Sequence, residues 1–356
     1  GFYALVGWLQ ARGRYSATLR LLIVMPALIA LGDWSRTWVL TGFPWLALGY
    51  AQVPVSPLAG YAPLLGVFGV SWLLAMAAGA LTLMLHYRKQ HRAVLFCFGL
   101  LAAIFFVGGM LKQIPWSQPV GEPIKVSLLQ GNVSQEMKFN EQRLLTTLKT
   151  YLDLTEKSSA RLIVMPETAI PLMQDQIPLD YLDLLAKAAK KNNGDVLVGL
   201  FGNKRENGKL EYFSSVMSFG SAPAQTYSKV HLVPFGEFIP FKPVIGWIYD
   251  KWLHIPLVDT SRGSPEQKPL NVAGQKVAVN ICYEDVFGEE IIRQLPEATM
   301  LVNVTNDAWY GESSAAYQHF EMAAMRAVEQ GRYLVRAANT GVSGIIDPYG
   351  RVLIRT

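Results

Sequence analysis

Three strand-like runs of the sequence each present, at or near their ends, a residue that can take part in covalent chemistry. The run "RLIVMPE" ends at Glu167, "AQTYSKV" presents Lys229, and "KVAVNIC" ends at Cys282. Functional side chains often lie at strand ends, where a rigid scaffold presents them. A thiol with an ordinary pKa of about 8.5 is mostly protonated near neutral pH, so a nucleophilic cysteine needs a base and a favourable field. Glu167 can accept the proton and Lys229 can supply positive charge, which predicts a cysteine nucleophile that attacks an acyl carbonyl.

The same stretches contain candidates for the other tasks of acyl chemistry. Attack on a carbonyl creates an oxyanion, which needs preorganised hydrogen-bond donors. The ammonium of Lys229 and the backbone N–H of Tyr283, the residue after the cysteine, can serve as these donors. A carboxylate base is efficient near neutral pH only if burial or a neighbouring acid raises its pKa. Two further acids, Glu237 and Glu284, stand in the same stretches.

Each of these residues has a non-catalytic interpretation when it is taken alone. A carboxylate after a strand is usually a turn or cap residue, an isolated lysine is usually a solvated strand edge, and a lone cysteine is often a small buried hydrophobe. A Cys–His pair is a further alternative, because His231, His254 and His319 lie in the same part of the chain. No histidine occupies a strand-end motif, however, and no His/Cys/Asp cluster has metal-ligand spacing. We expect neither a metal ion nor a cofactor.

An alternation of strands and helices after about residue 125 must position these side chains. The runs "SSVMSFG" and "AQTYSKV" predict a hairpin around Ala222 and Pro223. This alternation, mixed with hairpins, predicts an α/β domain with a mixed sheet and at least one layer of helices, over residues 116–356. The other expected strands are "IKVSLLQGN", "RLIVMPE", "DVLVGLFG", "KVAVNIC", "TMLVNVTN", "RYLVRAAN" and "VSGIIDPYGRVLI", and the expected helices span residues 141–157, 179–191 and 314–329.

The first third of the chain has a different composition. Hydrophobic residues make up 51% of the sequence and charged residues only 17%, and no charged residue occurs in 53–85 or 93–111. Each of these runs contains the roughly 20 apolar residues that span a bilayer as a helix. Residues 21–32 form a shorter candidate, and residues 2–9 resemble the end of another helix. We predict a transmembrane helical region over residues 1–115, and we expect the chain, which begins with Gly1, to be part of a longer protein.

The basic residues of the first third predict the orientation in the membrane. They lie in two connections between apolar runs, and cytoplasmic loops carry such an excess. The loop at 33–63 is rich in tryptophan and would lie on the other side, together with everything after Lys112. The net charge of +5 comes without a long basic block, so we expect no nucleic-acid partner. The only other cysteine, Cys97, falls inside a predicted membrane helix, so Cys282 is not expected to form a disulfide. The basic residues are Arg12, Arg14 and Arg20 in the first connection and Arg88, Lys89 and Arg92 in the second.

One aromatic-rich segment, 238–258, resembles no regular element. It holds three prolines, and an ordered loop packed on the core is one interpretation. The other is an exposed apolar arm that touches lipid or a lipid substrate. The candidate contact residues are Phe238, Trp247, Ile248, Trp252 and Leu253.

These motifs carry a resemblance to a known family. The stretches "VMPETAIP", "YSKVHLVPFGEFIP" and "NICYEDVFG" are similar to the Glu, Lys and Cys motifs of the carbon–nitrogen hydrolase (nitrilase) superfamily. The later stretches "VNVTNDAWYGESSAAYQH" and "RYLVRAANTGVSGIIDPYGRV" resemble the same superfamily. The membrane region with "RTWVLTGFPWLALGY" narrows the resemblance to the apolipoprotein N-acyltransferase family, of which the chain resembles a copy truncated at both ends.

The resemblance implies an αββα sandwich that follows a multi-helix membrane region. It implies Glu167 as general base, Lys229 as oxyanion stabiliser and Cys282 as nucleophile. Glu237 would position the lysine or the incoming amine, and Glu284 would support the cysteine loop.

It also implies a function. The expected enzyme moves an acyl chain from a phosphatidylethanolamine-like phospholipid, through a cysteine thioester, to the N-terminal amine of a diacylglyceryl-cysteine lipoprotein. It would lie in the bacterial inner membrane with its catalytic domain on the periplasmic side, and we expect a monomer. The alternatives are a membrane-tethered amidase or nitrilase that hydrolyses a small amide, and a catalytically inactive binding module.

Overall fold

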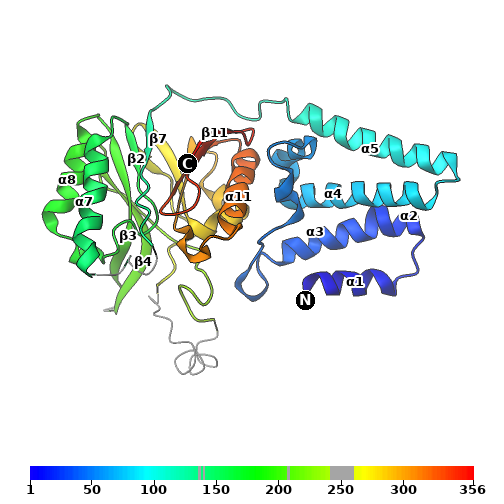
Figure 1. Ribbon diagram of the computed structural model, residues 1–356, viewed down its shortest axis with the longest axis horizontal. Coiled ribbons are helices and arrows are strands. Elements are labelled where there is room, and N and C mark those ends of the chain that lie inside the picture. Colours follow the sequence, from blue (N-terminus) through cyan, green and yellow to red (C-terminus); the bar gives the residue numbers. More distant parts are fainter. Residues whose placement is uncertain (135–137, 139–140, 207–208, 241–259) are drawn as a thin grey trace. The chain divides into compact units, whose positions relative to one another are not determined.

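The computed structural model describes residues 1–356 except 135–137, 139–140, 207–208 and 241–259 (Figure 1). The chain divides into two compact units. One comprises 1–118 with 324–331 and 347–351, and the other comprises 119–323, 332–346 and 352–356. The expected domain boundary between residues 115 and 116 stays a prediction.

The N-terminal unit is built from apolar helices. Within the described residues, three of them are long and apolar enough to cross a membrane: Ala17–Ser35, Pro57–His86 and His91–Leu111. The predicted spans at 21–32, 53–85 and 93–111 fall on these three helices. The bounds of the elements are α1 Phe2–Arg12, α2 Ala17–Leu19, the π-helix η1 Arg20–Val24, α3 Met25–Ser35, the 3₁₀ turns η2 Val39–Thr41, η3 Leu48–Gln52 and η4 Pro57–Tyr61, α4 Ala62–His86 and α5 His91–Leu111.

Two of these bounds differ from the apolar runs for physical reasons. The helix that contains 21–32 continues to Ser35 because Asp33 is fully buried there and pairs with Arg36 at 3.1 Å. The run that starts at residue 53 begins with a Val53–Pro54 bond and turns, so the α-helix begins only at Ala62. Large apolar side chains stand exposed on α4 and α5, as expected of a surface that meets lipid tails. They include Leu64, Leu65, Leu81, Leu85, Leu95, Phe96, Phe98 and Phe106.

The first sheet of the C-terminal unit has five strands in the order β1-β2-β3-β4-β5. The first three strands are parallel neighbours, whereas β3–β4 and β4–β5 are antiparallel. The β4–β5 pair confirms the hairpin predicted around Ala222. Two helices cover one face of this sheet (Figure 1). The elements are β1 Val126–Leu128, α7 Glu141–Lys157, β2 Leu162–Val164, η5 Gln174–Gln176, α8 Leu179–Lys190, β3 Asp195–Glu206, β4 Lys209–Gly220 and β5 Thr226–Ser228.

The second sheet has six strands in the order β11-β10-β9-β8-β7-β6. Its centre, β7–β8–β9, is parallel, and every residue of β8 is buried. Strands buried on both faces have continuous apolar sequences, which explains the runs "VAVNI" and "MLVNVT". The elements are β6 Leu270–Val272, β7 Gln275–Ile281, η7 Cys282–Val286, α10 Gly288–Ile291, η8 Ile292–Gln294, β8 Met300–Thr305, η9 Asp307–Tyr310, α11 Ala315–Gln330, β9 Tyr333–Ala338, β10 Gly344–Ile346 and β11 Val352–Arg355.

The two sheets lie between helical layers. In Figure 1, α7 and α8 lie outside the first sheet and α11 lies outside the second, so the order of layers is α, β, β, α. The predicted helices at 141–157, 179–191 and 314–329 are confirmed within one residue at each end. This confirms the αββα sandwich, and it shows two mixed sheets where the pattern of the residues alone indicated one.

Candidate active site

Glu167 and Lys229 come from two strands of the first sheet and meet in a buried cluster. Glu167 lies just beyond β2, where the turn is approached closely by β3. A Cβ at Gly199 of β3 would lie 2.2 Å from the carbonyl oxygen of Pro166, so glycine permits this approach. Lys229 directly follows β5, and its Nζ donates to Oε1 of Glu167 at 3.2 Å and to Oε1 of Glu237 at 2.8 Å. The structure therefore brings together three of the predicted site residues, with one ammonium shared by two carboxylates.

The electrostatics of this cluster follow from its burial. The Lys229 side chain is 1% exposed. Burial alone would lower the pKa of Lys229, but Glu167 and Glu237 outweigh it and hold that pKa well above its ordinary value. Burial raises the pKa of Glu237, Lys229 opposes this, and the negative charge of Glu167 adds to it. The cluster thus keeps a permanent cation beside two competing carboxylates.

Cys282 is presented by the second sheet. It follows β7 and opens the single turn η7, with a φ of +53° in the left-handed region that non-glycine residues rarely adopt. Burial raises the pKa of its thiol, Glu167 adds to the rise, and Lys229 opposes it. Both partners predicted from the sequence therefore act on this thiol. The resting cysteine is a protonated thiol that needs a base at the moment of attack.

Glu284 links the cysteine turn to the lysine segment. Its carboxylate accepts backbone N–H bonds from Ile281 at 2.7 Å and from Val230 at 2.6 Å, and a hydroxyl bond from Tyr227 at 3.1 Å. Burial raises the pKa of Glu284 to about 7, against the opposing effect of the backbone donors. The position of Glu284 between the two segments agrees with the supporting role predicted for it, which stays a prediction.

Tyr283 and His231 pack together beside the cysteine turn. The rings of Tyr283 and His231 meet edge to face with centroids 5.9 Å apart, and His231 also stacks on Phe287 at 3.6 Å. Nδ1 of His231 lies 3.0 Å from a carboxylate oxygen of Glu290. The role of the Tyr283 backbone N–H as an oxyanion donor stays a prediction.

A fully buried charge network, which the motif reasoning missed, lies under the cysteine turn. Nδ1 of His319 is 2.9 Å from Asp307 and its Nε2 is 2.9 Å from Asp285. Arg336 pairs with Asp285 at 2.8 Å and with Asp307 at 3.1 Å. Nε2 of His319 also lies 3.3 Å from the carbonyl oxygen of Cys282. These residues come from η7, η9, α11 and β9, so no spacing in the sequence could have joined them.

The charges of this network are set by its members. Burial and Arg336 lower the pKa of His319, but Asp285 and Asp307 outweigh them and raise it. Burial would raise the pKa of Asp307, but Arg336 and His319 lower it to about 2. The network holds the turn that carries the thiol.

Lys138 is a second buried lysine that the sequence reasoning missed. It is 6% exposed, and its Nζ donates to the backbone carbonyl oxygen of Glu167 at 3.1 Å. Burial lowers the pKa of Lys138 to about 8, although Glu167 and Cys282 oppose the shift. The residue stands in "QEMKFN", between a predicted strand and a predicted helix, where no pattern distinguishes it from a solvated lysine.

The predicted lipid-contact residues fall mostly outside the described part of the chain. Phe238 is half-buried, and the guanidinium of Arg262 lies 5.2 Å from its ring centroid. Trp247, Ile248, Trp252 and Leu253 lie outside the described residues, as does His254. The apolar arm stays a prediction.

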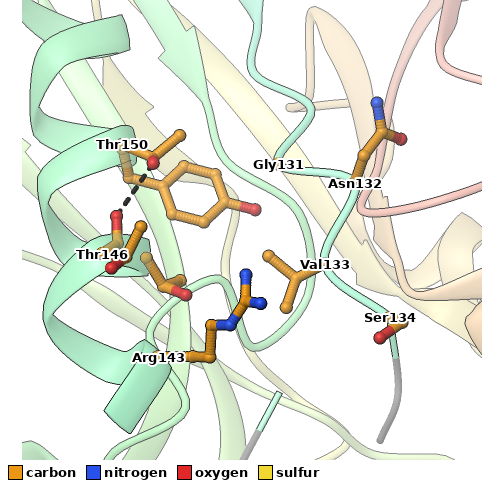
Figure 2. Close-up of a pocket in the computed structure, with 9 residues that line it drawn as sticks. Gly131, Asn132, Val133, Ser134, Arg143, Thr146 and Thr150 are labelled. Carbon is orange, nitrogen blue, oxygen red and sulfur yellow. Dashed lines mark hydrogen bonds between the residues drawn. The ribbon is translucent and has the colours of Figure 1, made fainter. Parts of the chain in front are cut away.

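A small pocket of about 190 Å³ lies elsewhere, between α7 and the loop that follows β1. Figure 2 shows Arg143, Thr146 and Thr150 of the helix facing Gly131 to Ser134 of the loop. None of the predicted site residues lines it. This pocket is therefore separate from the cluster around Lys229.

The fold agrees with the class of protein to which the family comparisons assign the chain. The model of the carbon-nitrogen hydrolase family matches residues 125–356, so the C-terminal unit is a carbon–nitrogen hydrolase domain. The model of the apolipoprotein N-acyltransferase N-terminal domain matches residues 1–80. The chain belongs to the apolipoprotein N-acyltransferase family, which joins these two parts in one membrane protein.

Curated relatives extend the similarity over nearly the whole chain. The apolipoprotein N-acyltransferase of Nitrosomonas europaea is 52% identical over 352 residues, which cover 99% of this chain and 69% of the relative. That of Methylococcus capsulatus is 44% identical over 354 residues, which cover 98% of this chain and 68% of the relative. A solved carbon-nitrogen hydrolase from Helicobacter pylori G27 aligns with a TM-score of 0.47 and 16% identity, over 65% of this chain and 85% of that one.

Proposed function

We propose that this protein moves a fatty acyl chain from a phosphatidylethanolamine-like phospholipid to the N-terminal amine of a diacylglyceryl-cysteine lipoprotein, through a thioester on Cys282. The observation that carries the proposal is the buried cluster in which Lys229 is shared by Glu167 and Glu237 and acts on the thiol of Cys282. This cluster stands in a chain with helices long and apolar enough to span a membrane, where both lipid substrates reside.

In the first half-reaction, the sulfur of Cys282 attacks the ester carbonyl of the phospholipid. The thiol proton passes to Glu167, which suits a buried thiol whose raised pKa keeps it protonated at rest. Lys229 and the backbone N–H of Tyr283 stabilise the oxyanion. The C–O bond then breaks, Glu167 returns the proton to the departing oxygen, and a lysophospholipid leaves.

In the second half-reaction, the amine of the lipoprotein attacks the thioester carbonyl. Glu167 accepts a proton from the amine, the new C–N bond forms and the C–S bond breaks. The thiolate leaves and regains its proton from Glu167. Glu237 holds Lys229 in place through both steps, since its carboxylate is the nearer of the two partners of that ammonium at 2.8 Å.

We further propose that the enzyme lies in the bacterial inner membrane with this domain on the periplasmic side. The support is the distribution of basic residues, which favours a cytoplasmic side for the connections at Arg12–Arg20 and Arg88–Arg92. Such an enzyme must exclude water from the thioester until the amine arrives. The segment 238–258 is the proposed cover, and its loss should shorten the lifetime of the thioester.

A two-substrate assay tests the proposed function. The full chain in lipid nanodiscs is given phosphatidylethanolamine and a peptide that begins with diacylglyceryl-cysteine. We expect the peptide to gain one acyl chain with release of an equal amount of lysophospholipid, and we expect neither product with Cys282→Ala. Hydrolysis of small amides with an unmodified peptide would contradict the proposal and favour the membrane-tethered amidase.

A further inference from the structure

The charges of the buried cluster do not balance without a further cation. Glu167 and Glu237 can carry two negative charges, and Lys229 supplies one positive charge that both share. Deprotonation of Cys282 requires Glu167 to be ionised, since it must accept the proton. An uncompensated second carboxylate in a buried site is costly, so one of the two would tend to be protonated. The raised pKa of Glu237, to which Glu167 contributes, reflects this competition.

Lys138 stands where a second cation is needed. Its ammonium is buried and donates to the carbonyl oxygen of Glu167, the residue whose side chain is bound by Lys229. Among the described residues, the charged or titratable groups that act on Lys138 are Glu167, beyond β2, and Cys282, beyond β7. Both are parts of the proposed machinery, and both favour the charged form of this lysine.

We propose that Lys138 is a positioning residue of the active site: its ammonium, held by the carbonyl oxygen of Glu167, supplies the second positive charge that keeps both carboxylates ionised until Cys282 passes its proton to Glu167. With Lys138 charged, the two lysines balance Glu167 and Glu237, and transfer of the proton from the thiol to Glu167 leaves that balance unchanged. With Lys138 neutral or absent, the same transfer occurs in a site with net negative charge, which disfavours the thiolate. The inference rests on the proposed acyl transfer and deepens it.

The inference predicts a distinctive pH profile. Because burial places the pKa of Lys138 at about 8, acylation of Cys282 should decline as the pH rises through about 8. Deprotonation of Lys229 does not account for such a decline in rate, since the pKa of Lys229 lies well above its ordinary value. Arginine stays charged throughout this range, so Lys138→Arg should move the decline to higher pH. Lys138→Met should show no decline of this kind, and its Cys282 should be acylated at least about tenfold more slowly at pH 7.

The experiment measures single-turnover acylation of Cys282 by phosphatidylethanolamine between pH 6 and 10, on the full chain in nanodiscs. Lys149→Met, which removes an exposed lysine of α7, is the matched control and should keep the wild-type profile. A wild-type rate without a decline between pH 7 and 9.5 overturns the inference without any variant. The inference is also overturned if the rate of Lys138→Arg declines at the same pH as that of the wild type. A folded Lys138→Met with the wild-type rate and pH profile overturns it as well.

A second measurement, the alkylation of Cys282 by iodoacetamide, separates this inference from the proposed function. The rate at which iodoacetamide alkylates Cys282 depends on its thiolate and needs no phospholipid. If phosphatidylethanolamine never acylates the wild type but Lys138→Met slows alkylation at pH 7, the proposed function fails and the role of Lys138 stands. If acylation proceeds and Lys138→Met changes neither alkylation nor its pH profile, the role of Lys138 fails and the proposed function stands.

Discussion

At the scale of single residues, the carboxylate of Glu284 accepts hydrogen bonds from four donors. One carboxylate receives backbone N–H groups from the cysteine side, Ile281, and from the lysine side, Val230 and His231. It also receives the hydroxyl of Tyr227. The bonds from Tyr227, Val230 and His231 tie the turn that presents the nucleophile to the segment that presents the cation. Glu284 therefore links the two segments that carry the thiol and the ammonium.

Replacement of Glu284 by glutamine should break that link. The amide NH₂ group of glutamine cannot accept a hydrogen bond, so the backbone N–H groups that it faces would lose their acceptor. Each unsatisfied buried donor costs about 1–3 kcal/mol. We expect Glu284→Gln to lower the free energy of unfolding by roughly 2–4 kcal/mol and to slow acylation of Cys282. Thermal unfolding and acylation rates measure the two effects. Glu289→Gln, at an exposed neighbouring acid, should behave like the wild type, and an equal melting temperature for both variants would contradict this role.

The site residues differ in how far the sequence could reveal them. Glu167, Lys229 and Cys282 each come at or just beyond the end of a strand, so the predicted strand ends indicated them as candidates. Lys138 follows no strand and lies in a connecting segment, and its burial depends on the tertiary fold. His319 was weighed as a partner of the cysteine because of its residue type. Its contacts with Asp285 and Asp307 needed the structure, since these acids are 34 and 12 residues away in the chain.

At the scale of elements, the carboxyl ends of the parallel strands β7, β8 and β9 converge on the nucleophile. Cys282 follows β7, Asp307 lies just beyond β8, and Arg336 belongs to β9. Asn303 of β8 donates to the carbonyl oxygen of Cys282 at 3.2 Å. The parallel order of these strands brings residues from distant parts of the chain to one edge.

Asp307 should therefore contribute to stability in a pH-dependent way. Its pKa in the folded protein is about 2, below the ordinary value of 3.8, so its contribution is complete above pH 3.8 and is lost as the pH falls through about 2. The difference corresponds to roughly 2 kcal/mol at neutral pH. We expect Asp307→Asn to be less stable by at least this amount at pH 7, and the gap to the wild type to shrink as the pH is lowered from 4 towards 2.

Thermal unfolding at a series of pH values measures this gap. Asp175→Asn, which changes an exposed aspartate of η5, serves as the control. A gap for Asp307→Asn that stays constant from pH 7 to the acid limit would contradict the account of the network.

The elements themselves were largely predictable, with two informative exceptions. The helices at α7, α8 and α11 are amphipathic with clear periodicity, and their bounds matched. The run "IKVSLLQGN" gave a strand of only three residues, because only Val126–Leu128 pairs with β2. Strand β3 extends to Glu206, past the apolar run "DVLVGLFG", because it pairs with β4 along its whole length. Strand length is set by the partner strand, which a single segment does not show.

At the scale of the whole molecule, the proposed function needs the catalytic domain and the membrane helices to serve lipid substrates from one side of the bilayer. The apolar helices and their lengths could be predicted from composition, because about 20 uncharged residues are characteristic of a span. The side of the membrane rests on the basic residues alone. Labelling of single cysteines in spheroplasts tests it directly.

We expect a cysteine placed at Lys268, an exposed position between β5 and β6, to react with a membrane-impermeant maleimide. A cysteine at Lys89, in the exposed connection between α4 and α5, should react only after the membrane is opened. Both are made in a Cys97→Ala, Cys282→Ala background, which removes the native thiols. The opposite pattern of labelling would place the catalytic domain in the cytoplasm and contradict the proposed orientation.

The central claim is that Cys282 carries the acyl chain, and the intact mass of the protein tests it most directly. After incubation of the full chain with phosphatidylethanolamine and no acceptor, we predict one added acyl mass that maps to Cys282. Neutral hydroxylamine should remove it, as expected of a thioester, and Cys282→Ala should not acquire it. A folded wild-type protein that iodoacetamide alkylates at Cys282, yet that gains no acyl mass from the phospholipid, would contradict the account.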